Sequence, residues 1–280
     1  MPVANEDLFS KLLTSTQRGY AISVPTLSDD LPTPIRQTGL IIGDLCFRNE
    51  DDSLEPLFNI ILPETHPTNC RGLPRNWSRL HLEDGDICER RLHYKADTTI
   101  SDITSTVRRR NFNMSLENPL VPIAGGGVTF DLFSTSNKSA VLFLPDGGTK
   151  IDLRPKKVFR AHAAKYAKGW CRFVEEELQR EIGPHGLILL TGVTKTSSWC
   201  MATVDNCGGG RSVSLNVKAV QVAGLGASYS WQWEHATSSM SSGPHRWPGE
   251  EDWRDNQTVF VTGYQIVPSL LGGPKVRPIP

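Results

Sequence analysis

The chain has 280 residues, and its 30 basic and 30 acidic residues leave no formal net charge. A neutral balance argues against a general nucleic-acid binder, and the longest apolar runs, LFNIIL (57–62) and LILL (187–190), are too short for membrane-spanning helices. The start, MPVANEDLFSK, has acidic residues where a secretory signal needs basic and then apolar ones. We therefore expect a cytoplasmic protein whose six cysteines are thiols.

The first half of the chain predicts one helix followed by strands. Helical spacing of apolar residues marks 5–20, and a connector rich in Pro and Asp follows at 25–39. Strands are predicted by four apolar runs, at 40–47, 57–62, 127–134 and 139–147. The last two of these runs predict a hairpin with TSNK at its turn. Residues 63–125 are dense in Pro, Arg and His, and predict only scattered short elements.

The longest helical pattern spans residues 153–182. Asp152 can cap its start, Pro155 is tolerated in the first turn, and Gly183 with Pro184 ends it. Apolar residues recur along it at the spacing of one helix face, at Phe159, Ala163, Tyr166, Trp170, Phe173, Val174, Leu178 and Ile182.

A second hairpin is predicted after this helix, from residues 187–204 and 211–222, which DNCGGG joins. Its arms exceed the usual strand of ~5–6 residues. Strands are also predicted at 228–235 and 257–267, and the tail 268–280 looks irregular. The order of elements predicts an α+β fold: a twisted, mostly antiparallel central sheet with two amphipathic hairpins and a long helix between them.

Residues suited to catalysis or metal binding are scattered. The set His66, Cys70, His81 and Cys88 lacks the paired Cys-x-x-Cys spacing of zinc sites. Neither GGG run precedes Gly-Lys-Ser/Thr, and no nucleophile-elbow or metalloprotease motif occurs. We expect no enzyme, no metal and no cofactor.

Basic residues gather on the long helix and on one earlier segment of the chain. On the helix they are Lys156, Lys157, Arg160, Lys165 and Lys168. Positive charge near a helix start opposes the helix dipole, so a partner is a reasonable explanation, although a solvated face is the commoner one. Beside an anionic lipid surface each basic residue contributes about 1 kcal/mol. The second cluster, VRRRNF (107–112), contains Arg108, Arg109 and Arg110.

The arms of the second hairpin are long enough for a second use. A membrane-spanning strand needs ~9–11 residues and is apolar only at alternate positions. The residues that we assign to a membrane hairpin are Lys195, Trp199, Val213, Leu215, Val217 and Lys218. A lysine on the lipid face at mid-depth costs about 2–4 kcal/mol, so both lysines would have to face water. A half-buried antiparallel sheet shows the same alternation and is the commoner cause.

The order of elements resembles the N-terminal, pore-forming domain of gasdermins, including the short fungal gasdermin-like proteins. GLIIGDLCF (39–47) resembles the early strand of that family, 187–204 with 211–222 its second hairpin region, and 256–267 its closing strand. The LxLxTGxxKTSSW type of run also resembles a protein family of mushroom-forming fungi. Residues 63–125 depart from the gasdermin pattern. The resemblance implies a single domain over 1–267 and a short tail, 268–280, in place of a large autoinhibitory domain.

The resemblance implies a pore-forming protein of regulated cell death and innate immunity. Such a protein binds acidic membrane lipids, oligomerises into a β-barrel pore, and moves from the cytoplasm to the plasma membrane after activation, in some cases by a protease. Some gasdermins carry an acylated or oxidised cysteine near this hairpin tip, where Cys207 stands here. Leu270 and Leu271 form an apolar pair that would serve as a tail latch.

A non-enzymatic binding module is the alternative. Tyr229, Trp231 and Trp233 alternate onto one face of a strand, with Trp247 and Trp253 in the loop that follows. An exposed row of aromatic rings stacks on sugars or on a partner surface, whereas a buried row is core.

Overall fold

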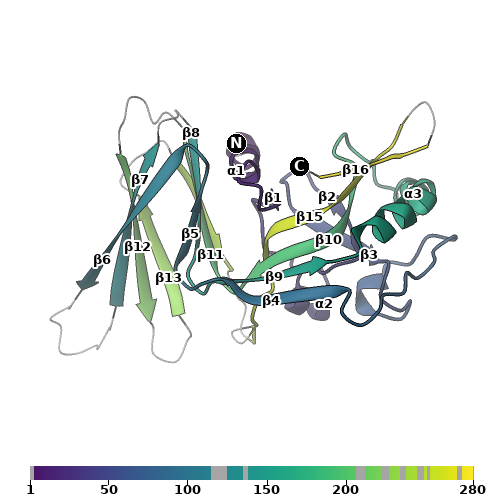
Figure 1. The fold of residues 1–280 in the computed structure, drawn as a ribbon, viewed down its shortest axis with the longest axis horizontal. Coiled ribbons are helices and arrows are strands. Elements are labelled where there is room, and N and C mark those ends of the chain that lie inside the picture. The colour runs from purple at the N-terminus through teal and green to yellow at the C-terminus, as the bar shows by residue number, and fades with distance from the viewer. Residues whose placement is uncertain are drawn as a thin grey trace.

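The computed structural model describes residues 3–114, 125–134, 138–205, 212–221, 227–233, 238–244, 249–250, 253–269 and 273–279. Its fold is α+β, as predicted, and every strand pair in the described parts is antiparallel. An eight-stranded sheet with most of the helices lies at one end of the molecule, and a sandwich of two four-stranded sheets lies at the other (Figure 1).

The eight-stranded sheet, here sheet A, is built around two long central strands, β10 (Leu187–Thr196) and β15 (Gln257–Val267). β15 also pairs with β1 (Tyr20–Ala21) and with β16 (Lys275–Pro278). On the edge of β10 away from β15, two strands pair with different parts of β10. β2 pairs with its first three residues, and β9 pairs from Gly192 onward. The outer strands are β2 (Asp44–Arg48) with β3 (Leu54–Asn59), and β9 (Gly148–Leu153) with β4 (Ile87–Tyr94).

Helices and connectors cover both faces of sheet A. On one face lies α3 (Lys156–Arg172), which ends in a π-helical turn, Phe173–Glu177. Its predicted apolar stripe is buried against the sheet at Phe159, Ala163, Trp170, Phe173 and Val174. On the other face, Ile35 of α2 (Thr33–Thr38) packs with Ile188 and Val261. The prediction that Asp152 caps α3 was wrong. Asp152 lies within β9, and Pro155 occupies the cap position.

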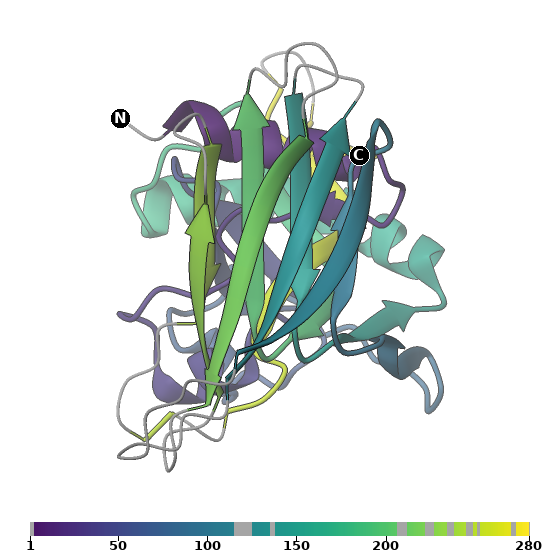
Figure 2. The ribbon, with the colours of Figure 1, turned by 90° about the vertical axis from the view of Figure 1, so that its left-hand side faces the viewer.

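The sandwich consists of sheets B and C. Sheet B has the order β14 (Ser238–Gly243), β11 (Trp199–Asp205), β8 (Lys138–Leu144), β5 (Thr98–Ser101). Sheet C has the order β13 (Ala227–Trp233), β12 (Ser212–Gln221), β7 (Gly125–Ser134), β6 (Ser105–Met114). Figure 2 shows the two sheets stacked, with the helices behind them.

The first helix, α1 (Val3–Thr14), packs on sheet B (Figure 1). Its Phe9 and Leu13 lie in one buried cluster with Leu142 of β8 and Met201 of β11. The residues of β8 that point to the other face of the sheet, such as Val141, are buried too. Both faces of sheet B are therefore covered, which explains why its strands are apolar at successive positions.

The two predicted hairpins contain strands, but the strands do not pair with each other. β7 pairs with β6 and β12, whereas β8 pairs with β5 and β11. The run 187–204 is two strands in two sheets, and its second strand, β11, pairs with β8 and β14 and not with β12. The prediction of pairing was wrong because alternation identifies a strand without identifying its neighbour, and each short link here crosses between two stacked sheets.

Residues 63–125 and the tail contain more structure than the sequence indicated. Residues 63–125 contain the 3-10 turn η1 (Pro67–Asn69) and strands β4, β5 and β6. The tail contains β16. β4, with the sequence ICERRLHY, is mostly exposed and pairs only with β9 among the described strands. An exposed edge strand lacks apolar alternation, which is why the pattern did not reveal it.

Candidate functional site

The basic face of α3, defined by Lys156, Lys157, Arg160, Lys165 and Lys168, is exposed along its whole length. None of these five side chains forms an ion pair within 4.0 Å with a carboxylate of the described residues. Lys165 lies 4.9 Å from the ring centroid of Tyr166. Val158, in the first turn of α3 with Lys156 and Lys157, is 45% exposed. The helix thus presents a surface of unmatched positive charge with an apolar residue inside it.

The second basic cluster lies far from the first. Arg108, Arg109 and Arg110 belong to β6, an edge strand of sheet C, while α3 lies at the opposite end of the molecule (Figure 1). The register pairs Arg108 with Asp131 and Arg110 with Thr129. The two clusters therefore belong to separate parts of the molecule and do not form one contiguous patch.

Two residues that we assigned to a membrane hairpin are buried where sheet A meets sheet B. Lys195 is 4% exposed and donates a hydrogen bond of 2.7 Å from Nζ to the carbonyl oxygen of Thr38. Trp199 is also 4% exposed, and its indole donates to Oε1 of Gln257 at 3.2 Å. In this structure neither residue lies in a hairpin with Lys218, because both face the interior between packed elements and β11 pairs with β8 and β14.

The Lys195 ammonium shares its surroundings with a buried carboxylate, Asp44 of β2. Asp44 accepts hydrogen bonds of 2.8 Å from the amide of Ile41 and from Nδ2 of Asn59. Burial raises the pKa of Asp44 to about 7, against the effect of these bonds and of Lys195. Burial lowers the pKa of Lys195 to about 8, although Asp44 favours its charged form. Sequence analysis had not singled out Asp44 as part of this pair.

Polar contacts hold the junction between sheets A and B. At one strand crossing, the Ser198 hydroxyl donates to Asp146 at 2.5 Å, and the Thr196 hydroxyl donates to the carbonyl oxygen of Gly147 at 2.7 Å. Gly147 has φ +77°, and a side chain there would meet the carbonyl oxygen of Tyr94. The strands therefore bend at a fixed point, where a glycine is required.

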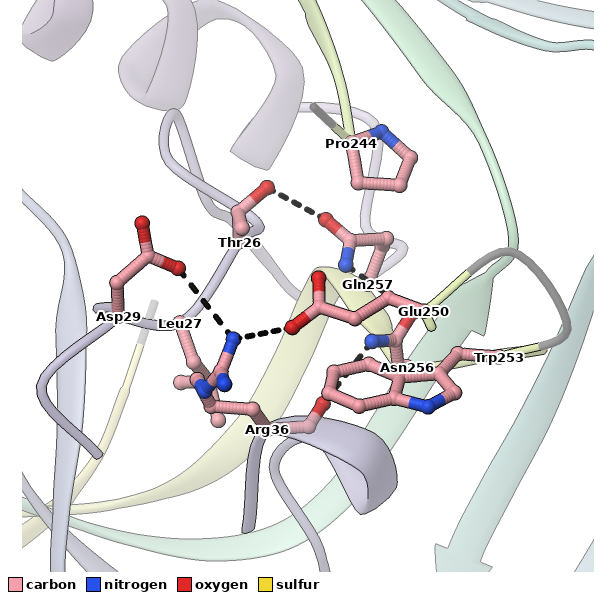
Figure 3. A pocket seen from close by; sticks show the side chains of 9 residues that line it. All are labelled: Thr26, Leu27, Asp29, Arg36, Pro244, Glu250, Trp253, Asn256 and Gln257. Atoms are coloured by element: carbon pink, nitrogen blue, oxygen red, sulfur yellow. Dashed lines mark hydrogen bonds and ion pairs between the residues drawn. The ribbon is translucent and has the colours of Figure 1, made fainter. Parts of the chain in front are cut away.

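A small polar pocket lies beside this junction (Figure 3). Arg36 of α2 bridges Glu250 at 2.5 Å and Asp29 at 3.5 Å, and its guanidinium lies 5.4 Å from the ring centroid of Trp253. Asn256 donates to the carbonyl oxygen of Arg36 at 2.9 Å. Because two carboxylates already match the arginine, the pocket is best explained as the contact that holds the segment before β15 against α2. Sequence analysis placed Trp253 in a possible aromatic platform, and the structure stacks it on Arg36 instead.

The register of sheet C gives it one apolar and one polar face. Val213, Leu215 and Val217 of β12 pair with Leu132, Phe130 and Val128 of β7. The alternate positions, Ser214 and Asn216, pair with Asp131 and Thr129. Lys218 pairs with Gly127 and Ser230 on this second face. Because alternate residues of a strand share a face, the predicted alternation of β12 extends to its neighbours.

The remaining sequence-based candidates are not brought together in the described residues. Cys207, Leu270 and Leu271 lie outside them. His66 caps η1 by accepting from the amide of Thr68 at 3.2 Å, and the described residues contain no group of three or more potential metal ligands.

In the described part of the chain, no helix combines the length and the apolar character needed to span a bilayer. Comparison with models of protein families finds no match, and comparisons with curated proteins and with solved structures find none either.

Proposed function

We propose that the chain is a pore-forming protein of anionic membranes, and that sheet C supplies the strands that enter the bilayer. The observation that carries this proposal is the combination of length and register in sheet C. Strands β6, β7 and β12 have 10 residues each, which is the length that a spanning strand needs. Two hairpins, β6–β7 and β12–β13, replace the hairpins that sequence analysis had proposed.

The apolar face of sheet C is suited to lipid on three of its four strands. Trp231 and Trp233 pair with Val217 and Leu215, so the aromatic residues fall in the apolar rows. This position favours burial or a bilayer interface over a free sugar-binding platform. On β6, Arg109 pairs with Phe130 and Asn111 with Val128, and both break the row. One arginine at mid-depth costs about 2–4 kcal/mol. Relative to exposure in water, each large apolar side chain in lipid is favoured by about 1.5–3 kcal/mol, so an opened face is more stable in the bilayer than in water.

The basic face of α3 is the proposed contact with lipid headgroups. Five exposed cations at about 1 kcal/mol each supply several kcal/mol of attraction to an acidic leaflet. Since α3 and sheet C lie at opposite ends of the molecule, the chain must change shape between binding and insertion (Figure 1).

A second copy of the chain is the proposed partner. Sheet C ends at β6 on one side and at β13 on the other, and these two strands run in opposite directions. If copies are arranged around an axis along the strands, β13 of one copy meets β6 of the next in the antiparallel sense. Closing the ring removes all free strand edges, which hydrocarbon does not tolerate.

Leakage from vesicles tests the proposed function, with two neighbouring variants on opposite faces of β12. Val217→Asp places a charge on the apolar face, and Asn216→Asp, the matched control, places the same charge on the polar face. We expect purified wild type and Asn216→Asp to release dye from phosphatidylserine vesicles, and Val217→Asp to bind them without release. Equal release by both variants, or none by the wild type, would contradict the proposal.

A further inference from the structure

Sheets B and C have the same strand order. Reading from one edge, β14, β11, β8 and β5 in sheet B stand where β13, β12, β7 and β6 stand in sheet C. Each strand of sheet B is also the chain neighbour of its counterpart in sheet C, through the short links 102–104, 135–137, 206–211 and 234–237. Every strand therefore keeps the same neighbours on both sides of its link.

The pairing register slips by two or three residues across the links of the inner pairings, and by six between the edge strand (β14, β13) and its neighbour (β11, β12). Ser101 pairs with Val141 in sheet B, and Ser105 pairs with Ser134 in sheet C, so one strand advances four residues while the other moves back seven. Between β11 and β8, Asp205 pairs with Lys138, and between β12 and β7, Ser212 pairs with Phe133. One strand advances seven residues while the other moves back five. Because one β-bulge takes up one extra residue, two or three bulges would absorb the slips of the inner pairings, whereas the edge strand would have to shift its register against β12.

The pairing also continues into sheet A. β8 runs into β9 and β10 runs into β11, and these strands stay paired on both sides of the junction. β4 and β5 likewise pair with β9 and β8 in turn. Sheets B and C are thus two halves of one four-stranded ribbon that leaves sheet A and folds back on itself.

A buried carboxylate fastens the one fold-back link that the structure describes. Asp102 is 2% exposed, and one of its oxygens accepts from the Thr104 amide and hydroxyl at 2.9 and 2.5 Å. The other oxygen accepts from the hydroxyls of Ser105 and Ser139 and the amide of Ala140, at 2.7 to 2.9 Å. Ser105 begins β6 in sheet C, while Ser139 and Ala140 belong to β8 in sheet B. Asp102 therefore ties the two halves of the ribbon where they fold.

We infer that the sandwich is a stored form of this ribbon, which opens by separating sheet C from sheet B while every strand keeps its neighbours, and that Asp102 holds the sandwich closed. This inference rests on the proposed function, and the opening is the conformational change by which sheet C would reach the bilayer. From Thr98 to Met114, one opened strand would extend roughly 55 Å from sheet A, at ~3.3 Å per residue. This length exceeds the hydrocarbon thickness of ~30 Å, so sheet A could stay at the surface while the tip of the ribbon crosses.

The inner faces of a folded strip lie on the same side when the strip is opened. Val141, Phe143 and Val204 are buried on the face of sheet B opposite α1. An apolar cover is required there, and the register offers the apolar face of sheet C. Opening would then join two apolar surfaces into one lipid-facing side, so water favours the closed form and a bilayer favours the open one.

Hydrogen exchange in solution tests this role of Asp102 without any membrane. Asp102→Asn removes the carboxylate, and Asp44→Asn is the matched control, because Asp44 is an equally buried and hydrogen-bonded carboxylate in sheet A. We expect Asp102→Asn to raise exchange at least tenfold for amides of Ser101–Thr106 and Ser139–Val141, with β2 and β3 unchanged. Asp44→Asn should leave the amides around the fold-back link unchanged. A uniform rise in Asp102→Asn, or no rise at all, would overturn the role of Asp102.

A distance between spin labels at positions 95 and 114 tests the opening itself. Lys95 is exposed just before β5, and Met114 ends β6. Cys70, Cys88 and Cys207 are replaced by serine to keep the labelling specific. With phosphatidylserine vesicles we expect the distance to lengthen to about 60 Å, at ~3.3 Å per residue, and to do so at least fivefold faster in Asp102→Asn.

The two proposals fail separately in this experiment. An unchanged distance in vesicles that leak would overturn the opening of the ribbon and leave pore formation standing. A lengthened distance without leakage would overturn pore formation and support the opening. An unchanged distance in intact vesicles would contradict both.

Discussion

At the scale of residues, sheet A buries two ionisable side chains that do not form an ion pair with each other. Asp44 and Lys195 are nearly inaccessible, yet the described contacts satisfy them with Asn59, Ile41 and Thr38 and with no mutual ion pair within 4.0 Å. Buried ionisable groups that are not directly paired remain costly in their charged forms. Their charge states should therefore make the stability of the fold depend on pH.

Asp44→Asn should change the pH dependence of unfolding in one direction. The folded-state pKa of Asp44 is raised to about 7, above an unfolded value of about 3.9. Its contribution to stability is therefore present below about pH 4 and lost as pH rises to 7, by up to about 1.4 kcal/mol per pH unit. Urea unfolding from pH 4.5 to 8 should show wild type losing stability relative to the variant up to about pH 7, with a constant difference above it. Parallel profiles would show that Asp44 is ionised throughout.

At the scale of elements, α3 was predicted well and the sandwich was not. The apolar spacing from Phe159 to Val174 fixed both the helix and its buried face, because a helix is specified by residues close in the chain. The pairing of β7 with β12 joins segments about 80 residues apart, for which one sequence contains no local signal. Lys195 was misplaced for the same reason, since its cover comes from α2 and β2.

The basic face of α3 gives a prediction for lipid binding. Reversing Lys156, Lys157, Arg160 and Lys165 to Glu should abolish cosedimentation with phosphatidylserine vesicles at physiological salt. The fold should persist, because all four side chains are exposed and α3 is held by its opposite face. Reversing Arg75, Arg79, Arg90 and Arg91, four exposed cations outside α3, is the matched control and should leave binding nearly unchanged. Binding retained by the α3 variant would show that its charge is only a solvated surface.

At the scale of the whole molecule, the C-terminal segment belongs to sheet A and is not the loose tail that its sequence suggested. β16 covers residues Tyr264–Val267 of β15, and the Ile279 amide donates to the carbonyl oxygen of Gly263 at 3.0 Å. Val276 packs against the core beneath α3. Four residues between Gly- and Pro-rich flanks offered no periodicity by which to recognise this strand.

The tail still gives a prediction about release. Ending the chain before Pro268 removes β16, uncovers the edge of β15 and loosens α3, so it should lower the melting temperature and raise the rate of dye release from phosphatidylserine vesicles. Val276→Ala should do both partially, while Lys275→Ala, at an exposed position of the same strand, should do neither. A truncated chain that melts earlier without faster release would restrict β16 to a structural role.

The central claim, that sheet C enters the bilayer, is tested most directly by an environment-sensitive fluorophore on single cysteines at positions 213 to 218 of β12. On adding phosphatidylserine vesicles, labels at 213, 215 and 217 should shift to the blue and become quenched by a probe in the acyl chains, whereas labels at 214, 216 and 218 should stay accessible to an aqueous quencher. This two-residue period follows from the register that pairs Val213, Leu215 and Val217 with apolar residues of β7. Six labels that all remain accessible to the aqueous quencher would contradict the claim.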